Sequence, residues 1–394
     1  MGTKHIIIGL FVAMFLMQSF SGWNPTSSTD RGTSDETEKD MGFISTASRR
    51  RTDEAVMFIN ASPAAGLSGI RGDNLAWGDY NNDGYIDLLV RGNTSSGTML
   101  FENQGPPSFN FLEVTDQVGI DCRGYSIWGD YDNDGNLDFF CAAKGDSLWR
   151  NEGAPDYNFI NVTSNEMYFK DNCPSEAAAW VDYDNDGFLD IFCTAWQNPD
   201  WQNYNWPNWG GVDRLWHNNG DGTFSDVTSE AGVYRNNPAH AAMSIAVCDY
   251  NDDGWQDIYV GNYHLCPNYL WENQGDGTFI NAAGPARADV DGDADYYENS
   301  GPYYGHSAGC AWGDFDNDLD MDLWVSNLAH KDDERSGMNR GAFCDDAQLL
   351  DSSGYPDYHF QDIRAEVGIP ITPSGTVIYD NEGNGYWKDE DYFG

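Results

Sequence analysis

The stretch that decides the fold is WGDYDNDGNLDFFC, residues 128–141. It recurs without gaps as WGDYNNDGYIDLLV at 77–90, WVDYDNDGFLDIFC at 180–193, VCDYNDDGWQDIYV at 247–260 and WGDFDNDLDMDLWV at 312–325. The first aspartate falls at position 79, 130, 182, 249 or 314, so successive copies start 51, 52, 67 and 65 residues apart. Self-similarity at such a period predicts a repeat architecture.

A second element follows each of the first four acidic stretches. It reads LFENQG at 100–105, LWRNEG at 148–153, LWHNNGDGTF at 215–224 and LWENQGDGTF at 270–279. These short runs are rich in aromatic and β-branched residues and are bounded by Gly, Asn, Asp or Pro, which is typical of strands. Each period therefore predicts four strands: one into the acidic loop, one out of it, an L-W/F-x-N strand and a last strand after a Gly-rich turn.

Four strands per period predict an all-β fold, a β-propeller of four-stranded blades with the acidic loops joining the first two strands of each blade. One unit of this size cannot bury both faces of its sheet, whereas a ring of units can. Six units are visible in the sequence, and a seventh blade stays an open alternative. The leading FINASPAAGL at 58–67 echoes the last strand of a unit, so we expect it to complete the final blade.

The acidic loops follow D-x-[DN]-x-D-G-x-x-D, which predicts calcium ligands. Ca²⁺ takes six to eight hard oxygen ligands, and Gly at the sixth position allows the positive φ of a sharp turn. Position seven contributes its backbone carbonyl. The predicted ligand sets are Asp79, Asn81, Asp83, Tyr85 and Asp87; Asp130, Asp132, Asp134, Asn136 and Asp138; Asp182, Asp184, Asp186, Phe188 and Asp190; Asp249, Asn251, Asp253, Trp255 and Asp257; and Asp314, Asp316, Asp318, Asp320 and Asp322. We expect about four to five Ca²⁺ ions per chain.

An EF-hand is the closest competing interpretation, and the sequence excludes it. An EF-hand loop needs Glu at position twelve and flanking helices. That position holds Val90, Cys141, Cys193, Val260 or Val325, each inside an apolar run typical of a strand. In the fifth loop Leu319 replaces the glycine, and a side chain at positive φ costs about 1–2 kcal/mol. We therefore expect the fifth site to be the weakest or to fold differently.

Composition limits the classes of partner. The chain of 394 residues carries 64 acidic and 20 basic side chains, a formal charge of −44. Such a charge argues against nucleic acid and against an anionic membrane surface. With 40% hydrophobic and 14% aromatic residues, the chain also differs from an acidic disordered tail.

The N-terminal composition predicts export. Residues 1–21 combine Lys4 and His5 with an apolar run from Ile6 to Met17 and small residues near Ser21, which is typical of a cleaved signal peptide. Residues 22–54 read as a disordered Ser/Thr/Asp-rich linker, and residues 55–394 as the propeller domain. We expect a secreted or cell-surface protein with no membrane insertion after cleavage. Eight cysteines in an exported chain suggest disulfides, although their pairing is undetermined and buried free thiols remain an alternative.

With its W-G-D-Y-D-N-D-G-x-L-D loops followed by L-W-x-N-x-G-D-G-T-F, the chain resembles the FG-GAP/VCBS repeat propellers, a superfamily that includes integrin α-subunit heads. The resemblance covers about residues 55–394. It implies a β-propeller, calcium in the hairpin between the first two strands of each blade, and an extracellular location. It does not imply one activity. This chain departs from the pattern at Leu319 and in a last unit that lacks an L-W-x-N strand.

Long insertions on the rim opposite the calcium loops predict a ligand site, since long loops on a rigid scaffold often carry function. The candidate residues are Trp196, Trp201, Trp206, Trp209, His240, His264, His306 and His330. Our first hypothesis is a non-enzymatic binding or adhesion module for an extracellular glycan or protein. The alternatives are a polysaccharide-active lyase or hydrolase that uses the same histidines, and a purely structural surface protein. No nucleophile elbow, HExxH motif or phosphate loop supports catalysis.

Overall fold

The computed structural model describes residues 60–92, 97–143, 145–163, 175–195, 211–233, 241–263, 266–289, 307–327, 347–354, 356, 358–363, 376–379 and 385–388. The predicted signal peptide at 1–21 and the predicted linker at 22–54 lie outside these residues. Within them the regular structure is almost entirely β. No helix of the described part is both long enough and apolar enough to cross a membrane.

Five four-stranded antiparallel sheets follow one another along the chain. The first has β1 (Gly72–Gly78), β2 (Asp87–Gly92), β3 (Thr98–Asn103) and β4 (Phe111–Glu113), and the second has β5 (Tyr125–Gly129), β6 (Asp138–Ala142), β7 (Ser147–Asn151) and β8 (Phe159–Asn161). The third has β9 (Ser175–Val181), β10 (Asp190–Ala195), β11 (Arg214–Asn218) and β12 (Phe224–Asp226). The fourth has β13 (Ala242–Cys248), β14 (Asp257–Asn262), β15 (Tyr269–Asn273) and β16 (Phe279–Asn281), after which comes the one-turn helix α2 (Ala283–Ala286). The fifth has β17 (Ser307–Gly313), β18 (Asp322–Asn327), β19 (Ala347–Ser352) and β20 (Phe360–Asp362).

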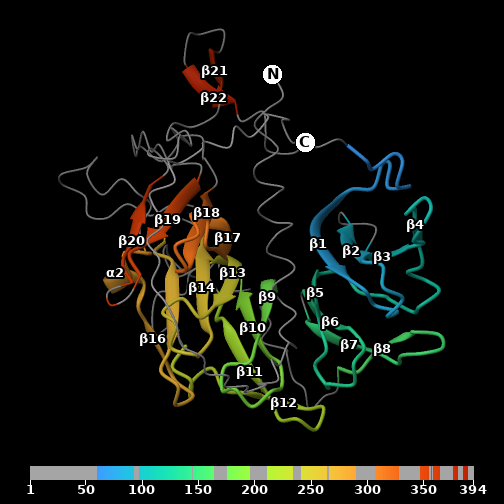
Figure 1. Cartoon of the computed structure of the whole chain (residues 1–394), viewed down its shortest axis with the longest axis horizontal. Coiled ribbons are helices and arrows are strands. Elements are labelled where there is room, and N and C mark those ends of the chain that lie inside the picture. The colour runs from blue at the N-terminus through green and yellow to red at the C-terminus, as the bar shows by residue number, and fades with distance from the viewer. Residues whose placement is uncertain are drawn as a thin grey trace, which may run out of the picture.

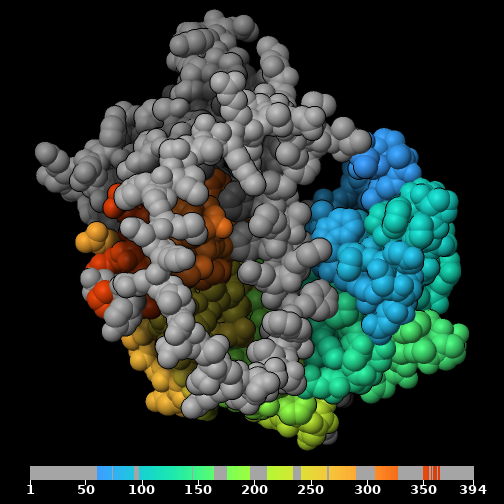
Figure 2. Space-filling model, viewed as in Figure 1, coloured from blue at the N-terminus to red at the C-terminus, as the bar shows by residue number. Residues whose placement is uncertain are grey.

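Each sheet pairs its strands in chain order, as the repeat predicts. The first strands β1, β5, β9, β13 and β17 pack each against the next, and Figure 1 shows the fourth strands on the outside. In the space-filling view the first sheet (blue to cyan) and the second (green) form one continuous surface (Figure 2). The prediction of four-stranded, blade-like units is thus confirmed. The hairpin of β21 (Thr376–Tyr379) and β22 (Gly385–Lys388) occupies the chain position of the predicted sixth unit.

The stretch before β1 repeats the connections between sheets. The carbonyl of Ala65 accepts a hydrogen bond of 2.9 Å from the N–H of Phe111, which begins β4. Val118 accepts the same bond from Phe159 at the start of β8, at 2.7 Å, and Ala231 accepts it from the start of β16. The described part of the leading echo, from residue 60 onward, therefore forms a blade connection.

The W-G-D motif is explained by packing between neighbouring sheets. The indole of Trp128 lies so close to Gly78 that a Cβ there would come within 2.9 Å of the ring, and its Nε1 donates to the carbonyl of Ala76 at 3.2 Å. Between the third and fourth sheets, Val181 and Val247 belong to one apolar cluster instead. The space between two adjacent sheets is thus filled either by a Trp packed on a Gly or by two Val side chains.

The described cysteines do not support the expectation of disulfides. Cys122, Cys141, Cys248 and Cys310 are free thiols, and the first two are buried. Burial raises the pKa of the Cys310 thiol to about 12. The alternative of buried free thiols therefore holds for Cys122 and Cys141, while Cys248 and Cys310 are free thiols that are partly exposed.

Candidate metal sites in the acidic loops

All five acidic loops share one backbone conformation. Position six has positive φ, from 80° at Leu319 to 88° at Gly254. Position four is also left-handed, with φ of 54° at Asn82 and 57° at Asn133. Asn and Asp tolerate this region better than other residues with side chains, which explains their presence at position four. The repeat pattern predicts the glycine at position six but not the left-handed residue at position four.

Aspartate carboxylates stabilise the turn by accepting hydrogen bonds from its backbone N–H groups. In the second loop Asp130 accepts the N–H of Asp134 at 3.0 Å and that of Gly135 at 2.9 Å. Asp134 in turn accepts the N–H of Asn136 at 2.8 Å. The same three bonds recur in the other four loops. The aspartates at positions one and five therefore shape the loop and still face one another.

The aspartate at position nine is the buried member of each loop. Asp138 has no exposed surface, and it accepts the N–H of Asn151 at 2.8 Å and that of Tyr131 at 3.3 Å. Burial raises its pKa to about 8, although these bonds and the neighbouring carboxylates also act on it. Burial likewise raises the pKa of Asp87 to about 7, of Asp190 and Asp257 to about 8, and of Asp322 to about 6. A cation nearby would favour the ionised forms.

Positions one, three and nine converge. Ligand oxygens of Asp130, Asp132 and Asp138 lie within 4.8 Å of one another, and the equivalent residues of the third and fifth loops do the same. The first and fourth loops have Asn81 and Asn251 at position three, whose amide oxygens are also hard ligands. Asp132 Oδ1 is buried with no hydrogen-bond partner. Such an oxygen, in a cluster of carboxylates, fits a dication.

The fifth loop keeps the shared conformation despite its leucine. Leu319 has φ of 80° and is 85% exposed, and its N–H still donates to Asp314 at 3.2 Å. The expected alternative of a different fold is therefore wrong, while the weaker site stays a prediction. The Asp320 side chain lies so close to Gly354 that a Cβ at that glycine would come within 2.6 Å of Asp320 Oδ2. Asp320 Oδ1 is a second buried carboxylate oxygen without a hydrogen-bond partner.

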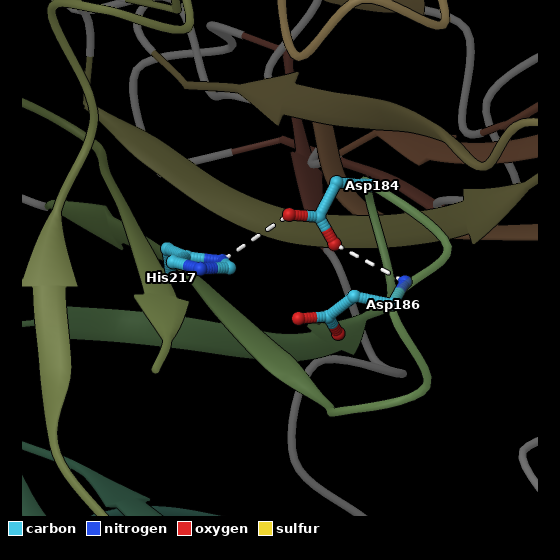
Figure 3. A group of neighbouring side chains, drawn as sticks. All are labelled: Asp184, Asp186 and His217. Carbon is cyan, nitrogen blue, oxygen red and sulfur yellow. Dashed lines mark hydrogen bonds and ion pairs between the residues drawn. The ribbon is translucent and has the colours of Figure 1, made fainter. Parts of the chain in front are cut away.

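A residue from the third strand of each sheet faces the loop, which the sequence analysis missed. Glu102 accepts the hydroxyl of Tyr80, and Glu272 accepts that of Tyr250, both at 2.9 Å. In the third sheet this position is His217, and Figure 3 shows its ring turned toward Asp184 and Asp186. In the sequence this residue is the x of the L-W-x-N element, and its polar or charged character is the signal that could have indicated a contact with the loop.

The repeated asparagine of the L-W-x-N element also links neighbouring sheets. Asn151 donates its side-chain amide to the carbonyl of Tyr80 in the preceding loop at 2.8 Å. Asn218 and Asn273 make the same bond to Tyr131 and Tyr183, at 2.9 and 2.7 Å. The asparagine of L-W-x-N thus ties each loop to the next blade.

The residues predicted for a ligand site cannot be placed in this geometry. Trp196, Trp201, Trp206 and Trp209 lie outside the described residues, as do His240, His264, His306 and His330. Their role stays a prediction.

Comparison with known proteins agrees with the repeat geometry. The model of the FG-GAP-like repeat matches residues 79–141, 130–193 and 201–260. These parts of the chain are FG-GAP-like repeats. The matched segments contain the first four acidic loops, so the family resemblance seen in the sequence is confirmed.

Curated relatives and solved structures cover different shares of this chain. Human cartilage acidic protein 1 is 32% identical over 124 residues, 31% of this chain and 16% of that protein, and the mouse protein is 30% identical over 17% of its length. An Agrocybe aegerita lectin described as recognising non-reducing terminal N-acetylglucosamine shares 18% identity at a TM-score of 0.44, with 82% of this chain and 76% of the lectin covered. The V. cholerae biofilm matrix protein Bap1 shares 13% identity at a TM-score of 0.35, with 71% and 37% covered.

Proposed function

We propose that the acidic loops bind divalent cations, Ca²⁺ wherever the donors are oxygens alone, and that the ions stabilise a rigid binding module. The observation that carries the proposal is the repeated convergence of carboxylates from positions one, three and nine, with Asp132 Oδ1 buried and unpartnered among them. Oxygen-only donor sets of this kind suit Ca²⁺. Mg²⁺ fits less well because it retains water and prefers fewer protein ligands.

In the second loop the ion would be held by Asp130, Asp132, Asp134 and Asp138, with the carbonyl of Asn136. Its charge would offset the repulsion among carboxylates that lie within 4.8 Å of one another. Since Asp138 is anchored to Asn151, and Asn151 to the carbonyl of Tyr80, the ion would also stabilise the contact between the first two sheets. We propose the same arrangement for the first, fourth and fifth loops.

We further propose that the sheets belong to a closed ring. Trp77 on the first sheet is 37% exposed, whereas the equivalent Trp128 is 9% and Trp312 3% exposed, because each of these two packs on the preceding sheet. A further blade beside the first sheet would cover Trp77 in the same way. The sixth unit, which begins with β21 and β22, is the segment of this chain that we assign to that place.

For the function of the assembled module, we propose that the exported protein binds an extracellular glycan or protein and performs no catalysis. Support comes from the FG-GAP repeats, a scaffold of rigid sheets, and from the aromatic insertions in the sequence between 196 and 209. Exposed aromatic rings stack on sugar rings and pack against protein surfaces.

The test is a glycan array probed with the purified full chain, once with Ca²⁺ and once with chelator, while each bound sugar is assayed for cleavage. We expect Ca²⁺-dependent binding without product. Product formation would contradict the non-enzymatic proposal. A blank array with folded, Ca²⁺-loaded protein would remove glycans as partners and leave protein partners to be tested.

A further inference from the structure

The third loop differs from its neighbours in the residue that the third strand directs toward it. At this position the first and fourth sheets have Glu102 and Glu272, and the second has Arg150. The third sheet has His217 on β11, an imidazole where these sheets have a carboxylate or a guanidinium group. The ligand chemistry available to the third loop is therefore different.

The imidazole reaches the carboxylates of the loop. His217 Nδ1 lies 3.1 Å from Asp190 Oδ1 and 3.4 Å from Asp184 Oδ2. Single ligand atoms of His217, Asp184 and Asp186 all lie within 4.8 Å of one another, as Figure 3 shows for the side chains. These residues come from two separate elements, the loop and β11.

The ring has a defined orientation. It meets the Tyr183 ring edge to face, with centroids 5.8 Å apart and an interplanar angle of 84°. About a quarter of the His217 side chain and 30% of the Asp184 side chain remain exposed. A cation could therefore reach the site from solvent, and the ring already faces the carboxylates.

Mixed imidazole and carboxylate donors favour a different class of cation from oxygen donors alone. Ca²⁺ takes oxygen ligands, whereas imidazole suits Zn²⁺ and other first-row transition metals. We propose that the third loop is a transition-metal site, in which His217 Nδ1 binds a dication such as Zn²⁺ together with the carboxylates of Asp184 and Asp186. This inference rests on the proposal that the acidic loops hold dications, and it names a distinct ion for one of them.

The experiment measures Zn²⁺ binding to the metal-free full chain in the presence of saturating Ca²⁺, by competition with a chromophoric chelator. The informative variant is His217→Glu, which places on β11 the glutamate that the first and fourth sheets have at this position. The matched control is His359→Gln, an exposed histidine in the turn before β20, away from the third loop. Ca²⁺ stoichiometry is measured on all three proteins.

We expect His217→Glu to lower the affinity for one Zn²⁺ by about 100-fold, the upper part of the range found when a metal shell is altered, while His359→Gln changes nothing. Ca²⁺ binding should persist in both variants. Equal Zn²⁺ affinity in His217→Glu and the unchanged protein would overturn the inference, and so would an equal loss in His359→Gln. Absence of Ca²⁺ binding in every protein would instead contradict the proposed function.

A second measurement needs no variant, in case His217→Glu does not fold. The unchanged protein is treated with diethyl pyrocarbonate in the presence of Ca²⁺, with and without Zn²⁺, and modification is mapped by mass spectrometry. Zn²⁺ should slow modification of His217 at least tenfold and leave His359 unaffected. Modification of His217 at the same rate with Zn²⁺ present would overturn the inference.

Discussion

The second and fifth acidic loops have the same backbone conformation although they differ in the residue at position six. Both bring aspartates from positions one, three and nine within 4.8 Å, and both turn at a left-handed residue in position six. In the second loop that residue is Gly135, and in the fifth it is the exposed Leu319. A leucine there costs about 1–3 kcal/mol, which burial of its side chain does not offset. The comparison teaches that the carboxylate hydrogen bonds, rather than the glycine alone, determine the loop.

We expect the largest effect from substitutions at position nine, where the second and fifth loops should lose different amounts of stability. Asp138→Ala leaves the buried N–H groups of Asn151 and Tyr131 without an acceptor and removes a proposed ligand. We expect it to lower the free energy of unfolding in Ca²⁺ by about 3–5 kcal/mol, as when one partner of a buried charge is lost. Asp322→Ala should cost less, because we expect the fifth site to bind its ion more weakly. Urea unfolding in saturating Ca²⁺ measures both, and equal losses would contradict the difference.

The next prediction concerns pH without Ca²⁺. Burial raises the pKa of Asp138 to about 8 and of Asp322 to about 6, above the ordinary value of 3.8. Between pH 4 and 8 the folded chain therefore binds more protons than the unfolded chain, so its stability falls as pH rises. Asp138 alone should lose about 1.4 kcal/mol of stability for each pH unit over most of the range from pH 5 to pH 8, so we expect a total loss of several kcal/mol. Thermal unfolding in chelator measures this loss.

With Ca²⁺ bound, the trend should reverse, because the ion favours the ionised carboxylates and is lost as they become protonated. Asp138→Asn should reduce the slope of the apo profile between pH 6 and 8, where Asp190 and Asp257 still titrate, whereas Asp322→Asn should leave that part nearly unchanged. An apo protein that is more stable at pH 8 than at pH 5 would contradict the prediction.

Exchange of the residues at position six tests the strain itself. Leu319→Gly should raise Ca²⁺ affinity at the weakest site by about tenfold, which corresponds to about 1.4 kcal/mol of relieved strain. Gly135→Leu should weaken another site by a similar factor, because Gly135 has φ of 87°. Calorimetric titration with Ca²⁺ resolves the classes of site. If neither exchange alters an affinity, the strain does not act on binding.

The smallest effect lies at position four, between loops. Asn133 donates its side-chain amide to the carbonyl of Gly187 in the next loop at 2.9 Å, whereas the fourth loop has Asp252 at this position with nearly the same φ. Asn133→Asp should keep the conformation and lose the donor, at a cost of about 1 kcal/mol. Asp252→Asn is the reciprocal variant, expected to stabilise the contact with the fifth loop. Thermal unfolding in Ca²⁺ compares the two, and a neutral Asn133→Asp would show that the bond contributes nothing measurable.

Sequence periodicity was sufficient for the strands and loops, because alternation and turn residues act over a few positions. The contacts between blades were not predictable in this way. Asn151 reaches Tyr80, 71 residues away, and His217 reaches Asp184 from another strand. Those contacts depend on how whole sheets pack, which no local pattern encodes. Leu319 shows the converse, since a local rule suggested a change of fold that the surrounding hydrogen bonds prevent.

Calcium titration of the chelator-treated full chain, followed by native mass spectrometry and by thermal unfolding, tests the calcium proposal most directly. We predict four to five bound Ca²⁺ ions, the last of them weaker, and a Tm that rises by more than about 10 °C on loading, as several kcal/mol of linked binding requires. A folded chain that binds no Ca²⁺ and keeps the same Tm in calcium and in chelator would contradict it.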